Sequence, residues 1–152
     1  MNLSRRMFAK GMLATTAMFA FASSLPKALL AAYNKEAFES NKMADAMKAY
    51  YGTAETTESD QIKITAPNIA ENGAVVPISI SSEIDGAESI SIFVENNPTP
   101  LIGSFILLGA KQNISTRIKM AKTSNLYAVV KAKGKLYATH QEIKVTIGGC
   151  GG

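Results

Sequence analysis

The chain of 152 residues is 47% hydrophobic and has a formal net charge of +4 at pH 7. This length allows one domain with a modest core. Four of the sixteen basic residues and none of the twelve acidic ones lie in residues 1–32, so the rest of the chain holds twelve of each and is formally neutral. The positive charge therefore gives no reason to expect nucleic acid as a partner.

The first 32 residues have the pattern of a twin-arginine signal peptide. Arg5 and Arg6 lie within Ser-Arg-Arg-Met-Phe-Ala-Lys, and a mildly apolar stretch follows over residues 11–25. Such a signal is an address for a translocase that exports folded proteins, which predicts a periplasmic location. Small residues place cleavage near 31–33. The alternative, a retained membrane anchor, is disfavoured because the stretch is shorter than the ~20 residues that span a bilayer.

Residues 33–60 are predicted to form an N-terminal helix and a connector. The helix is expected over 34–51, with Asn34 as its cap and Gly52 beyond its end. The connector, residues 53–60, is rich in Thr and Glu. Apolar and aromatic side chains recur at helical spacing and predict a face turned to the core. They are Met43, Met47, Tyr50 and Tyr51.

Residues 61–147 change to a period of two, which predicts short strands. Seven or eight strands with no intervening helix favour a mostly β fold, an immunoglobulin-like antiparallel β-sandwich. Pro77 predicts an edge or a bulge in its strand. The apolar segments begin at Ile62, Val76, Ile90, Leu101, Ile114, Leu126, Leu136 and Ile143. Turn signals separate them at Asn72-Gly73, Asp85-Gly86, Asn96-Asn97-Pro98, Gly109, Ser124-Asn125 and Lys133-Gly134-Lys135.

Charge is distributed unevenly along the chain. Residues 36–95 hold eleven of the twelve carboxylates, whereas 111–144 hold eight Lys and Arg side chains against Glu142 alone. The cationic half would suit anionic ligands or an acidic partner face, and a solvated basic surface explains it equally well. With one His and one Cys, no metal site is expected. His140 is predicted to be a surface or strand-end residue and not a catalytic base.

The last five residues predict a flexible arm. Gly148, Gly149, Gly151 and Gly152 flank Cys150, the single cysteine of the chain. Glycine is too mobile and too small to build a core at a terminus, and an unpaired cysteine in an exported protein indicates an intermolecular bond or a reactive thiol. We interpret the segment as the arm of a covalent carrier; the alternative is a disordered tail with an incidental cysteine.

The motifs of the chain resemble those of the SoxY family, the sulfur carrier subunit of the periplasmic thiosulfate-oxidising system. The most specific is the ending Val145-Thr146-Ile147-Gly148-Gly149-Cys150-Gly151-Gly152. Further matches are Ala70-Glu71-Asn72-Gly73 before Val76-Pro77, Glu95-Asn96-Asn97-Pro98 with Pro100-Leu101, and Arg117-Ile118-Lys119-Met120-Ala121. The resemblance spans most of residues 36–152.

This resemblance implies a carrier that is not itself an enzyme and holds no cofactor. It implies a heterodimer with SoxZ, a second immunoglobulin-like subunit. A haem-containing enzyme would couple thiosulfate to Cys150 as a cysteine S-thiosulfonate. A hydrolase would then release sulfate, followed by a sulfane dehydrogenase in systems that include one. Nothing in the arm lowers the thiol pKa from its ordinary ~8.5, so activation is expected from the partner pocket.

Two alternatives from other classes remain open. A chain ending in Gly-Gly is similar to ubiquitin-like carriers, in which the terminal carboxylate, here that of Gly152, becomes a thiocarboxylate. That activation needs ATP and a cytoplasmic enzyme, so the export signal argues against it. The other alternative is an exported immunoglobulin-like binding module with a thiol tail.

Overall fold

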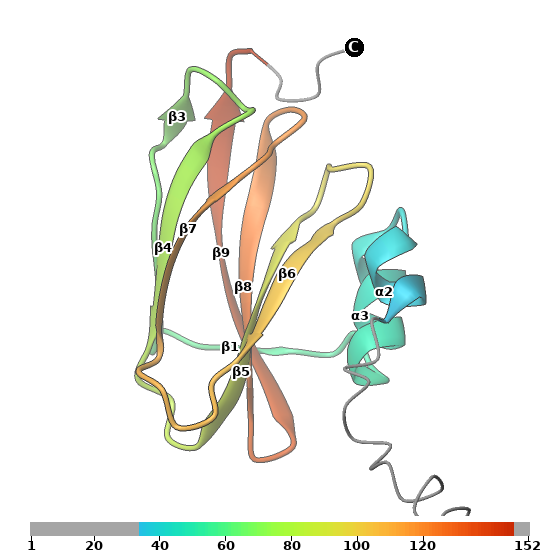
Figure 1. Cartoon of the computed structure of the whole chain (residues 1–152), viewed down its shortest axis with the longest axis vertical. Coiled ribbons are helices and arrows are strands. Elements are labelled where there is room, and N and C mark those ends of the chain that lie inside the picture. Colours follow the sequence, from blue (N-terminus) through green and yellow to red (C-terminus); the bar gives the residue numbers. More distant parts are fainter. Residues whose placement is uncertain (1–33, 148–152) are drawn as a thin grey trace, which may run out of the picture. The chain divides into compact units, whose positions relative to one another are not determined.

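Two β-sheets face each other in the structure, a computed structural model that describes residues 34–147. Two short helices, α2 (Lys35–Glu39) and α3 (Met43–Tyr51), lie to one side of the sheets (Figure 1). The strands are β1 (Thr57–Glu58), β2 (Ile62–Thr65), β3 (Ile69–Ala70), β4 (Val76–Ser82), β5 (Ala87–Val94), β6 (Leu101–Ile106), β7 (Asn113–Ile118), β8 (Ser124–Ala132) and β9 (Lys135–Val145).

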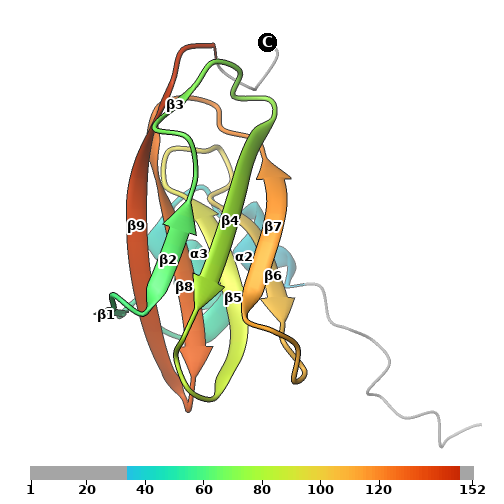
Figure 2. The same ribbon diagram turned by 90° about the vertical axis from the view of Figure 1, so that its left-hand side faces the viewer.

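The large sheet has the order β1-β9-β8-β5-β6, with β3 also pairing with β9, and the small sheet has the order β2-β4-β7 (Figure 2). The pairs within the main ladders are antiparallel, whereas β1 and β3 run parallel to β9. The expected immunoglobulin-like sandwich is confirmed. The two short parallel strands were not predicted, because two residues are too few to show a period.

The main core lies between the sheets and is built from the alternating apolar side chains. Ile80 of the small sheet and Ile92, Leu126, Val130 and Ile143 of the large sheet are fully buried in it. Fully burying one such side chain contributes about 1.5–3 kcal/mol to stability. Because the burial follows the period of two, it also fixes the register of each strand pair.

The predicted helix over 34–51 is two helices in the structure. Asn34 caps the first as expected, since its Oδ1 accepts a hydrogen bond from Ala37 N at 3.0 Å. The chain leaves the helix at Ser40, whose backbone is extended and whose hydroxyl donates to Glu36 O at 2.7 Å. This break lets α2 fold back on α3, and the rings of Phe38 and Tyr50 meet edge to face with centroids 6.4 Å apart.

The helices cover the outer face of the large sheet, and their Met and Tyr side chains face inward as the spacing predicted. Met47 is buried, and Met43, Tyr50 and Tyr51 pack on the same cluster with Phe93 and Val129 of the sheet. The Tyr51 hydroxyl is 2.5 Å from Ser91 Oγ, and Ser91 donates in turn to Ser104 Oγ at 2.7 Å. Burial raises the pKa of Tyr51. This hydroxyl chain ties α3 to β5 and β6.

The last predicted strand segments, 136–139 and 143–147, join into the single strand β9, which ends at Val145 and leaves out Thr146 and Ile147. His140 and Gln141 continue the ladder opposite Tyr127 and Leu126 of β8. The polar run in the sequence suggested a break, but side chains on the open face of a sheet can be polar without interrupting backbone pairing. His140 is therefore exposed as predicted but lies within a strand, not at its end.

Pro77 lies in β4, the middle strand of the small sheet. It pairs only with Arg117 of β7, because the ladder to β2 ends at Thr65 and Ser79, two residues short of Pro77 in β4. Proline has no N–H to donate to a ladder. On the side of β2, Pro77 therefore has no strand partner. It lies at an edge position, in agreement with the sequence-based expectation.

Candidate functional site

The predicted carrier arm, residues 148–152 with Cys150, lies outside the described residues, as do Arg5 and Arg6 of the predicted signal. The structure does describe the base of the arm. Strand β9 ends at Val145, and Thr146 and Ile147 follow it to the edge of the described region. The candidate site is therefore built from the residues that surround these last three.

The base of the arm is held by a neighbouring segment, residues 68–73, which we name the seat. Strand β3 within the seat pairs parallel with β9 (Figure 1). The hydrogen bonds between them run from Lys144 N to Asn68 O (3.0 Å), from Thr146 N to Ala70 O (3.1 Å), from Thr146 Oγ1 to Glu71 O (3.0 Å) and from Gly73 N to Ile147 O (2.8 Å). The chain is thus fixed by backbone bonds up to the residue before the first arm glycine.

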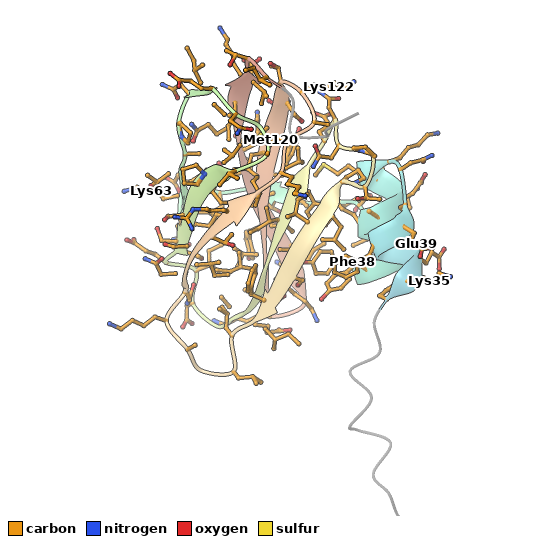
Figure 3. All side chains as sticks on the ribbon, turned by 45° about the horizontal axis from the view of Figure 1, so that its top comes forward. Lys35, Phe38, Glu39, Lys63, Met120 and Lys122 are labelled. Atoms are coloured by element: carbon orange, nitrogen blue, oxygen red, sulfur yellow. The ribbon has the colours of Figure 1, made fainter. Side chains whose placement is uncertain are left out.

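The seat is itself braced by the connection between β7 and β8. Met120, which is fully buried, donates its N–H to Gly73 O at 2.8 Å (Figure 3). Thr123 accepts a hydrogen bond at Oγ1 from Val145 N at 3.0 Å. The seat and the arm base are therefore each bonded to the connection between β7 and β8.

Asn97, from the connection between β5 and β6, in turn holds that loop. Its Oδ1 accepts a hydrogen bond from Ala121 N at 2.9 Å, and its Nδ2 donates to Lys119 O at 2.8 Å. The segments 70–73, 95–98 and 117–121, which carried the family resemblance in the sequence, thus meet at one end of the sandwich around the arm base. Sequence reasoning identified each segment but did not predict that they meet.

Three large apolar side chains are exposed at this end. We name Ile69, Val75 and Ile147 the exit patch; their exposed fractions are 57%, 53% and 69%. Ile69 lies within the seat, Val75 follows it two residues later, and Ile147 is bonded to it. The other exposed large apolar side chains of the described region lie at the opposite end, on β6 and the loop after it. They are Phe105, Ile106 and Leu108.

The cationic half of the sequence does not form one basic face. Lys131 and Lys133 are paired with Glu88 at 3.1 Å and with Asp85 at 2.6 Å. The exposed cations at the arm end, which have no ion-pair partner within residues 34–147, are Arg117, Lys119, Lys122 and Lys144. Lys122 is labelled in Figure 3. Exposed carboxylates of this end are Glu71, Glu95 and Glu142. Charge of both signs surrounds the arm base, so its apolar residues are the more distinctive feature.

The rest of the described region holds no evident catalytic constellation. His140 is exposed and stacks on Tyr127 with ring centroids 5.1 Å apart. Within residues 34–147, no cluster of three or more His, Cys, Asp or Glu side chains could hold a metal ion. An open groove of about 780 Å³ crosses the outer face of the small sheet, and Pro77, Ser79 and Arg117 are among its lining residues. Neither α2 nor α3 is long and apolar enough to cross a membrane.

Comparison with known proteins extends these observations. The family described as "Sulfur oxidation protein SoxY" matches residues 47–150. The solved structure of the sulfur carrier protein SoxY from Chlorobium limicola f thiosulfatophilum is 48% identical in sequence and superimposes with a TM-score of 0.64. That match covers 70% of this chain and 97% of the other chain. No curated protein sequence matches the chain. The family match includes both the sandwich and the segments that meet around the arm base.

Proposed function

Because the chain belongs to the SoxY family of sulfur oxidation proteins, we propose that it is a sulfur carrier that holds intermediates of thiosulfate oxidation on Cys150. The observation that carries this proposal is the contrast at Ile147. The chain up to this residue is fixed by hydrogen bonds to the seat, and residues 148–152 are four glycines and one cysteine. A thiol on a glycine tether beyond a rigid base can enter a pocket of another protein while the sandwich remains outside.

The chemistry at Cys150 follows from the thiol. In the loading step a bond forms between the cysteine sulfur and the outer sulfur of thiosulfate. The thiol proton is released, and two electrons pass to a haem-containing partner enzyme. Hydrolysis of the resulting S-thiosulfonate by a second enzyme would release sulfate and leave a sulfane sulfur on the cysteine. A sulfane dehydrogenase would oxidise that sulfur in systems that include one. In this proposal the chain is a covalent co-substrate of these enzymes.

Intact mass spectrometry tests the carrier function. After incubation with thiosulfate and the cognate haem enzyme, the chain is expected to gain mass on Cys150, located by fragmentation. A gain on the carboxylate of Gly152 would instead show a thiocarboxylate carrier. No gain on any residue would show an exported binding module, and either of these two results would contradict the proposal.

We further propose that the chain pairs with a SoxZ-like subunit. The family supports such a partner, and β6 and β7 are sheet edges that each pair with one strand within the described region. Free edges can accept another chain. Co-expression is expected to give a stable heterodimer that survives reducing agent, because the contact does not involve Cys150. Size-exclusion chromatography that shows only monomer under reducing conditions would contradict this expectation.

We propose the periplasm as the location, on the strength of Arg5 and Arg6 and the apolar stretch that follows them. A signal of this kind exports a folded chain, which suits a carrier that is assembled with its partner before transport. Cell fractionation checks the location: the processed chain is expected in the periplasmic fraction, and a cytoplasmic location would overturn it.

A further inference from the structure

We infer that a partner enzyme binds the exit patch, Ile69, Val75 and Ile147, when it receives Cys150. The part of the enzyme that contacts the patch is the rim of its active-site entrance. This inference rests on the proposed carrier function. It adds the location of the contact and its chemistry, which is apolar at the centre. The occupant is an enzyme surface with an apolar rim around a narrow entrance.

The reach of the arm limits where the enzyme can dock. The carbonyl of Ile147 is held by the N–H of Gly73 at 2.8 Å, so the tether begins there. Cys150 is three residues farther along the chain, and these residues span at most about 10 Å when extended. A pocket that receives the sulfur must therefore have its mouth within roughly this distance of Ile147. Its rim has to contact the surface from which the arm leaves.

The chemistry of that surface favours an apolar contact. More than half of each side chain in the exit patch is exposed, and all three belong to the seat, its flanks or the arm base. Grouped exposed apolar side chains often mark interaction sites, and interfaces usually have an apolar centre and a polar rim. The charged groups around the patch have both signs, so charge alone would not select a partner.

The side chains of Ile69 and Val75 are not needed to hold the arm. The seat binds the arm base through backbone groups and the Thr146 hydroxyl, and the neighbouring Ala70 provides the buried side chain of β3. Exposed apolar side chains add little to the stability of the fold. Substitutions at these two positions can therefore change the docking surface and leave the arm base intact.

The test compares a double variant of the mature chain with a single-site control, each purified with its partner subunit. The first is Ile69→Ser with Val75→Ser. We expect the KM for the carrier in enzyme-dependent loading with thiosulfate to rise about tenfold, because two side chains no longer bury apolar area against the enzyme. The kcat and the rate at which iodoacetamide alkylates the free thiol are expected to stay near the wild-type values.

The control is Leu108→Ser, which removes an exposed apolar side chain of the loop at the opposite end, where its exposed fraction is 94%. Its KM is expected to stay within about twofold of the wild type, since docking is not affected. A wild-type KM for the first variant, or an equal rise of the KM in both variants, would overturn the inference. Failure of the wild-type chain to load would instead overturn the proposed carrier function.

Discussion

Replacement of Cys150 by serine is expected to abolish loading and sulfur-dependent turnover without unfolding the protein. The serine hydroxyl ionises far less readily than a thiol, whose ordinary pKa is ~8.5. It also cannot form the sulfur–sulfur bond on which the carrier chemistry depends. Intact mass after incubation with thiosulfate and the haem enzyme should show no adduct, and turnover should fall to the level without carrier.

Stability provides the control for this variant. Cys150 follows the last strand, and the described core of the sandwich is complete without it. The free energy of unfolding is therefore expected to change by less than about 0.5 kcal/mol, as for other surface substitutions. Thermal unfolding of both proteins measures this change. A large loss of stability, or turnover retained by Cys150→Ser, would show that the cysteine has a different role.

The sequence predicts the longer strands well because they bury apolar side chains of one face in the core. In β4, for example, Val76, Ile78 and Ile80 are buried and alternate with more exposed residues. The same reasoning is incomplete for β5, where Ser91 and Phe93 occupy the other face and are fully buried as well. A period of two identifies the face toward the main core, but it does not show that α2 and α3 cover the opposite face.

The elements that were missed depend on contacts made by the folded chain. The break between α2 and α3 lets Phe38 pack against Tyr50, and no proline or glycine marks it in the sequence. The short strands β1 and β3 exist because their backbones meet β9. Two residues in a strand give no periodic signal.

The arm and its base were not equally predictable. The composition of residues 148–152 indicated a thiol tether directly, and the role of Cys150 stays a prediction. The seat could not be predicted, because it is held mainly by backbone groups, which every residue carries. The bond from Thr146 Oγ1 to Glu71 O joins residues 75 positions apart. The Asn-Gly pair at 72–73 signalled a turn, but not its contact with the end of β9.

Replacement of Gly149 by valine is expected to separate the reactivity of the thiol from its access to the enzyme. If the arm is a free tether, a small alkylating reagent should react with Cys150 of Gly149→Val within about twofold of the wild-type rate. Enzyme-dependent loading should fall sharply, by tenfold or more. Valine restricts the backbone conformations open to glycine and adds bulk where the chain must enter a narrow pocket. A small displacement of a reacting group can cost about a hundredfold in rate.

Gly149→Ala is the graded control, because it adds one carbon and is less restricted than valine. Its loading rate is expected to lie between those of the wild type and Gly149→Val, while all three alkylation rates agree. The discriminating quantity is the ratio of enzyme-dependent loading to alkylation, measured on one preparation of each protein. An equal loss of both rates in Gly149→Val would mean that the arm is already ordered against its own domain. In that case the rigid base at Ile147 would extend to Cys150, and the enzyme would have to bind the arm as part of a fixed surface.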